Sequence, residues 1–95
     1  MKNELDMLTQ HAKARSQQRG IPTIVIDLLL DFGATTQAPG GAEKIYFDKS
    51  SRKRLRAYAG PLASLLERHL NVYAVVNNED RVITTGFRLG RIRHR

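Results

Sequence analysis

The stretch that decides the fold is VYAVVNNEDRVITTGFR, residues 72–88. Residues 72–76 are almost continuously apolar, which is typical of a central strand, and the polar residues 77–80 predict a loop. Residues 81–88 then predict a returning antiparallel strand. Strict alternation divides its side chains between two faces, with Ile83, Thr85 and Phe87 on one and Val82, Thr84, Gly86 and Arg88 on the other.

An earlier hairpin extends this sheet. Pro39-Gly40-Gly41 is a turn signal, preceded by a short predicted strand at 35–37 and followed by a strand at 44–47. Ile45 and Phe47 are expected to point inward, and Tyr46 to point to the other face. The two hairpins predict an antiparallel sheet of three or four strands.

Helices fill the rest of the chain. Residues 3–19 predict a first helix with Asn3 as N-cap and Gly20 as left-handed C-cap, and a second runs from Pro22 to Gly33. Ser50 or Ser51 is expected to cap a third helix at 52–59, and a short fourth follows at 62–70. The order predicts an α+β domain with helices on one sheet face. The other face stays partly open, and Tyr46, Thr84 and Arg88 should point there.

The composition indicates a polyanionic partner. The 95 residues are enough for one domain, with a basic tail from about residue 89 that is expected to be mobile. The chain has 16 Lys and Arg against 9 Asp and Glu, a net charge of +7, and 11 of the cations are arginines, which suit bidentate phosphate contacts. A polyanion such as nucleic acid is therefore the expected partner, although an acidic protein would also satisfy the charge.

The absence of cysteine excludes disulfides, zinc fingers and thiol catalysis. No metal or cofactor is expected, because the acidic residues are scattered and no histidine or carboxylate pair has ligand spacing. The longest nearly apolar run is too short to span a bilayer, so we expect a cytoplasmic protein.

One stripe of residues combines an imidazole with fixed cations. His11, Arg15 and Arg19 are spaced four apart, so they should share a face of the first helix. Such a stripe can hold a phosphate, or it can be a solvated face. Arg15 and Arg19 also stabilise a helix C-terminus simply by their charge.

The motifs H-A-x-x-R-x-x-x-R-G-I at 11–21 and V-I-T-x-x-x-R at 82–88 resemble those of a family of small bacterial and phage domains of unknown function. That family is similar to the RelE and ParE toxins, within the wider barnase, EndoU and RelE group. The resemblance implies a RelE-like fold and a metal-independent ribonuclease that acts on RNA. It also implies the role of a toxin in a toxin–antitoxin pair, with an acidic antitoxin as partner. It implies site residues at His11, Arg15, Arg19, Thr84 and Arg88.

Metal-free RNA cleavage needs proton carriers and cations around the phosphate. We assign the proton transfer to His11 and a hydrogen bond to Thr84. Phosphate contacts are assigned to Arg15, Arg19 and Arg88. Further cations are expected to bind the RNA backbone: Arg19, Lys49, Arg52, Lys53, Arg56, Arg91 and Arg93. The cations between Lys49 and Arg56 lie at a helix N-terminus, where positive charge opposes the helix dipole. This position favours a role for these cations other than helix stability.

A second hypothesis is a non-catalytic basic module, or a phage-type inhibitor, that binds nucleic acid or an acidic protein. The nuclease hypothesis requires His11 and Arg88 to converge on one groove.

Overall fold

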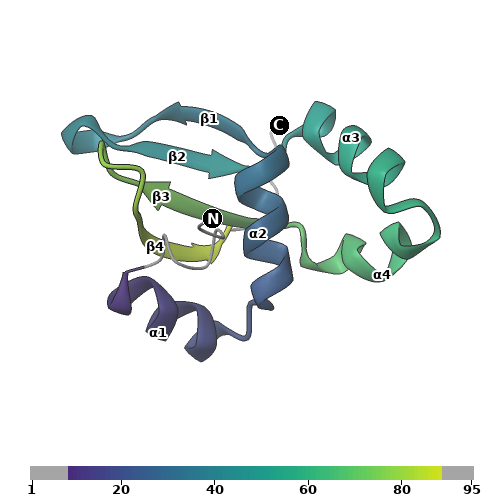
Figure 1. The fold of residues 1–95 in the computed structure, drawn as a ribbon, viewed down its shortest axis with the longest axis horizontal. Coiled ribbons are helices and arrows are strands. Elements are labelled where there is room, and N and C mark those ends of the chain that lie inside the picture. Colours follow the sequence, from purple (N-terminus) through teal and green to yellow (C-terminus); the bar gives the residue numbers. More distant parts are fainter. Residues whose placement is uncertain (1–8, 89–95) are drawn as a thin grey trace.

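Four antiparallel strands form one sheet in a computed structural model that describes residues 9–88 (Figure 1). The strands are β1 (Ala34–Gln37), β2 (Glu43–Tyr46), β3 (Val72–Val76) and β4 (Val82–Phe87), and they lie in the order β1-β2-β3-β4. A turn of 3₁₀ helix at Pro39–Gly41 joins β1 to β2. The sheet confirms the predicted α+β class.

The helices are α1 (Gln10–Arg19), α2 (Thr23–Phe32), α3 (Lys49–Ala59) and the single turn α4 (Ala63–Leu66). Two 3₁₀ turns, Gly60–Leu62 and Glu67–His69, flank α4. α2 crosses one face of the sheet, α1 lies beside β4, and α3 and α4 extend past the end of the strands (Figure 1). Within residues 9–88, no helix has the length and apolar character needed to cross a bilayer.

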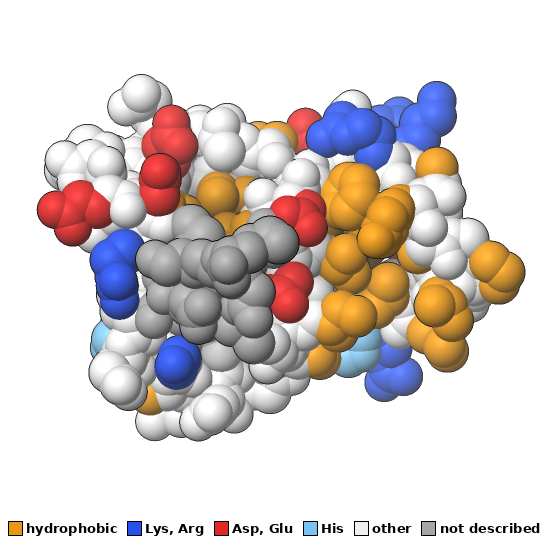
Figure 2. Space-filling model, in the orientation of Figure 1, with side chains coloured by type: hydrophobic (Ala, Val, Ile, Leu, Met, Phe, Trp, Pro, Cys, Tyr) orange, Lys and Arg blue, Asp and Glu red, His pale blue; other side chains and the backbone are white. Residues whose placement is uncertain are grey.

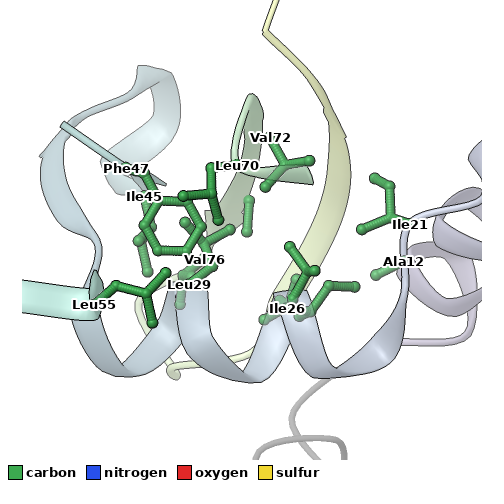
Figure 3. Close-up of a cluster of buried hydrophobic side chains, with 13 residues drawn as sticks. Ala12, Ile21, Ile26, Leu29, Ile45, Phe47, Leu55, Leu70, Val72 and Val76 are labelled. Atoms are coloured by element: carbon green, nitrogen blue, oxygen red, sulfur yellow. The ribbon is translucent and has the colours of Figure 1, made fainter. Parts of the chain in front are cut away.

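The core lies between α2 and the sheet. α2 contributes Val25, Ile26 and Leu29, all buried. They meet buried side chains from the strands, from α3 and from the segments that join them, drawn in Figure 3: Ile45, Phe47, Leu55, Leu70, Val72 and Val76. Apolar burial of this kind is the main stabilising contribution in a small domain. Ile45 and Phe47 thus point inward, as the sequence predicted.

The strand register explains one error of the sequence prediction. Val76 pairs with Val82, whereas the preceding Val75 pairs with Thr84, so Ile83 is an extra residue in a β-bulge. The bulge turns Val82 to the helix-covered face, where it is fully buried. The alternation that placed Val82 on the same face as Thr84 is therefore wrong at this position.

The first helix begins later than predicted. Thr9 is its N-cap, in an extended conformation, and its Oγ1 accepts a hydrogen bond of 3.1 Å from the Ala12 amide. The predicted start at residue 3 is wrong, because a helix cannot continue through that backbone conformation. Asn3 itself lies outside the described residues. Gly20, at φ 70°, forms the predicted left-handed C-cap.

The cap of α3 also differs from the prediction. Asp48, rather than Ser50 or Ser51, is the N-cap, and its carboxylate accepts a hydrogen bond of 2.8 Å from the Ser51 amide. The Ser51 hydroxyl accepts in return from the Asp48 amide at 2.8 Å. This capping box satisfies two amides that a helix start leaves free. It begins the helix at Lys49, so the predicted start at residue 52 is also wrong.

Candidate functional site

The sheet face opposite the helices carries basic and aromatic side chains. Cross-strand pairing aligns Lys44 with Val75 and Val75 with Thr84 in one row. In the next row, Tyr46 pairs with Tyr73 and Tyr73 with Gly86. Residues that pair directly across strands share a face, so these two rows form one surface. We call it the open face.

A hollow of about 630 Å³ lies on the open face. Its lining residues come from the end of α1, the β1–β2 turn and three strands: Arg19, Ala38, Pro39, Lys44, Tyr73, Val75, Phe87 and Arg88. Three of them are cations and none is acidic. A concave surface with one sign of charge concentrates ions of the opposite sign, so the hollow suits an anionic ligand.

Two tyrosine rings support two of the cations. Lys44 Nζ lies 4.8 Å from the centroid of the Tyr73 ring. Arg88 Cζ lies 4.8 Å from the centroid of the Tyr46 ring. Both distances fall within the range of attractive cation–π contacts. The rings therefore hold the charges against the sheet while leaving their N–H donors available to a ligand.

Arg19 reaches the hollow because Gly86 has no side chain. A Cβ atom on Gly86 would lie 2.5 Å from Arg19 Nη1 and 2.8 Å from Tyr73 Oη. A larger residue would therefore require the ends of the Arg19 and Tyr73 side chains to move, whereas the φ of Gly86 lies outside the left-handed region. The gap brings a guanidinium and a phenol hydroxyl to one place, which is a suitable pair for one phosphate group.

Contacts between α1 and β4 fix the position of Arg19. The Thr9 amide donates to the Val82 carbonyl at 3.0 Å at the start of the helix. Further along, the buried Ser16 and Thr85 hydroxyls share a hydrogen bond of 2.6 Å. These bonds, with the buried Ala12, hold α1 along the edge strand so that its last turn ends beside the open face.

His11 and Arg15 are not among the residues that line the hollow. Each step of four residues turns about 40° around a helix, so the stripe rotates by about 80° between His11 and Arg19. His11 is exposed, and it lies two turns, roughly 12 Å along the axis, before Arg19. Arg15 is half-buried, and its Nε has no hydrogen-bond partner among residues 9–88.

Among the four predicted catalytic residues, Arg88 alone lines the hollow. Thr84 lies on the open face in the row of Lys44, half-buried and outside the lining. The convergence of His11 and Arg88 on one groove stays a prediction. Arg19, predicted both as a phosphate contact and as a backbone contact, is the member of the stripe that lines the hollow.

The cations of α3 have structural roles that the sequence did not indicate. Arg52 Nη2 donates to the Leu70 carbonyl at 3.2 Å and to Asn71 Oδ1 at 2.8 Å. Burial lowers the pKa of Arg52, the Glu67 carboxylate opposes this, and the Arg88 charge lowers the pKa further. Arg54 donates to the Phe32 carbonyl at 2.9 Å, which ties α3 to α2.

The other predicted backbone contacts are separate from the open-face hollow. Arg56 Nε lies 3.6 Å from a Glu67 carboxylate oxygen. Lys49, Lys53 and Arg56 line a shallow second hollow of about 500 Å³ on the outer side of α3. Arg91 and Arg93, like the predicted mobile tail, lie outside the described residues.

Sequence reasoning missed Lys44 and Tyr73. The signal was present in the strand alternation, because Lys44 shares a face with Tyr46, and residues 73 and 75 point away from the core formed by 72, 74 and 76. The missing step was the strand pairing that places Lys44 over the Tyr73 ring.

No group of three or more His, Cys, Asp or Glu side chains between residues 9 and 88 is arranged to hold a metal ion. Comparisons with protein families, curated proteins and solved structures found no match to this chain. The RelE-like resemblance is therefore still a prediction. Any function must be argued from the open face itself.

Proposed function

We propose that this protein binds single-stranded RNA across the open face of its sheet. One observation carries the proposal: Arg19, Lys44 and Arg88 converge on a hollow with no acidic lining residue. Phosphodiesters supply the matching charge, and arginine binds them through paired N–H donors. The half-buried Tyr46 and Tyr73 stand beside these cations, and aromatic side chains on sheets contact unstacked bases in proteins that bind single strands.

The first test measures affinity for a fluorescently labelled, unstructured RNA oligonucleotide by anisotropy. Arg88→Ala and Lys44→Ala should each weaken binding by roughly tenfold, because each removes a charge-assisted phosphate contact. Each should also reduce the slope of log affinity against log salt by about 0.7, the value for one lost contact to a single strand.

Arg81→Ala is the matched control. Arg81 is an exposed cation at the start of β4 and does not line the hollow, so its removal changes the net charge equally. The proposal predicts affinity within about twofold of wild type for this variant. Equal losses in Arg81→Ala and Arg88→Ala would mean that binding depends on overall charge, and would reject the open face as the site.

Metal-independent RNA cleavage is the second candidate. The observation that favours it is the Tyr73 hydroxyl beside Arg19 Nη1, since a hydroxyl next to a cation can transfer a proton where a phosphate is bound. Incubation of RNA with protein in EDTA tests this candidate. Cleavage should fall at least about tenfold in Tyr73→Phe, the loss typical of one general acid or base.

The sequence hypothesis assigns the proton transfer to His11 instead. Cleavage that is lost in His11→Ala and retained in Tyr73→Phe would place the chemistry on α1. Intact RNA after prolonged incubation, with binding preserved, would leave the chain a binding module. We propose a cytoplasmic location for either activity, and an acidic antitoxin-like protein as the competing ligand of the same cations.

A further inference from the structure

The helix-covered side of the molecule exposes four large apolar side chains. Ile24 of α2 is 57% exposed, Tyr58 of α3 is 73% exposed, and Leu62 and Leu65 next to and within α4 are 61% and 68% exposed. Figure 2 shows hydrophobic side chains gathered over α2, α3 and α4. We call this surface the helical patch. Contiguous exposed apolar surface usually marks an interaction site.

The helical patch is held in place by internal contacts. The Phe32 and Tyr58 rings pack with centroids 5.2 Å apart and join α2 to α3. The Arg54 guanidinium donates to the Phe32 carbonyl at the same junction, at 2.9 Å. The apolar side chains are therefore presented by packed helices, which lowers the entropy cost of covering them.

Charges of opposite sign border the helical patch on its two sides. Ile24, Asp27, Leu28 and Asp31 recur at helical spacing on one face of α2, so the two carboxylates flank its apolar residues. Arg54 and Lys53 provide the charges on the α3 side. Figure 2 shows acidic side chains beside the patch near α2 and basic side chains near α3.

Asp27 and Asp31 have no cation partner among residues 9–88. No ion pair within residues 9–88 involves Asp27 or Asp31, and Asp27 Oδ1 is buried without a hydrogen-bond partner. Burial raises the pKa of Asp27, and the neighbouring Asp31 charge raises it further. A purely acidic partner would face these carboxylates, and a purely basic partner would face Arg54 and Lys53.

We infer that the helical patch is a dimer interface that takes a second copy of this chain. A two-fold axis places the same patch on itself, so the apolar residues meet and the acidic edge of each copy faces the basic edge of the other. The hollow on the open face lies on the opposite side of the sheet. The dimer therefore leaves the open-face hollow of each copy accessible.

The test is the molar mass of the full chain in solution by light scattering during size-exclusion chromatography, over a dilution series. The wild type should show twice the 10.7 kDa of one chain at high concentration. Leu65→Glu should elute as a monomer with an unchanged circular dichroism spectrum, because it places a charge in the interface. Gln37→Glu, the same charge change on exposed β1, should remain dimeric.

A second measurement uses the absence of cysteine from the chain. Under mild oxidation, Leu65→Cys should form a disulfide-linked dimer much faster than Gln37→Cys does. A monomeric wild type at every concentration would overturn the inference. Equal cross-linking rates at the two positions, or a Leu65→Glu variant that is still dimeric, would overturn it as well.

Discussion

Gly86 shows how one residue determines the shape of the proposed site. Its missing side chain leaves the space that Arg19 Nη1 and Tyr73 Oη occupy, and any larger residue must displace them. The sequence placed Gly86 on the open face but gave no reason for a glycine there. That reason is tertiary, since it depends on how α1 packs against β4, and no pattern within the strand indicates it.

Gly86→Ala should weaken RNA binding by roughly fivefold, because the methyl group pushes the guanidinium and the phenol out of the hollow. Fluorescence anisotropy measures the loss. Since Gly86 acts through Arg19, the effect should largely disappear in an Arg19→Ala background. Independent, additive losses in the double variant would show that Gly86 does not act by making room for Arg19.

Among the helices and strands, the sequence could predict the features that depend on local conformation. Local conformational preferences predict the turn at Pro39–Gly41 and the Gly20 cap, and strand alternation predicts the inward positions of Ile45 and Phe47. The β-bulge at Val75 and Val76 does not, because it depends on the register between two strands. The predicted starts of the first and third helices were wrong for a related reason, because several residues near each start can cap a helix.

At α3, Asp48 has a cap-forming side chain just as the predicted Ser50 and Ser51 do. The structure selects Asp48 because Ser51 then stands three residues later and returns the hydrogen bond. The cations Arg52 and Arg54 that follow oppose the helix dipole, but their hydrogen bonds to Leu70, Asn71 and Phe32 explain them. These hydrogen bonds give the two cations a structural role in the fold, and the predicted contact of Arg52 with nucleic acid stays a prediction.

The Asp48 cap should make stability depend on pH. Hydrogen bonds from the Ser51 amide and hydroxyl lower the pKa of the Asp48 carboxyl below its ordinary 3.8. Its stabilising contribution is therefore fully present above 3.8 and is lost as the pH falls through the lower, folded-state pKa. Asp48→Asn keeps an oxygen acceptor but cannot titrate.

Thermal unfolding of the wild type and of Asp48→Asn over a range of acidic pH measures the contribution of the Asp48 carboxylate to stability. At neutral pH the wild type should be the more stable, and the difference should shrink once the pH drops below 3.8. Curves that stay parallel through this range would show that the carboxylate makes no pH-dependent contribution to the folded state.

At the scale of the whole molecule, the sequence predicted a one-sided α+β sheet and an open face bearing Tyr46, Thr84 and Arg88. Strand alternation and composition were sufficient for that result. They could not show which cations of a chain with net charge +7 gather together, since Arg19, Lys44 and Arg88 come from three separate segments. The helical patch was likewise unpredictable, because leucines at helical spacing normally indicate a buried face.

The most direct test of the open-face site is a titration of ¹⁵N-labelled protein with unlabelled single-stranded RNA, followed by amide chemical shifts. The proposal predicts that the amides of Lys44, Tyr73, Gly86 and Arg88 shift together and saturate at one affinity, while those of Lys49 and Lys53 on α3 stay in place. Shifts confined to the start of α3, or to His11 and Arg15, would contradict it.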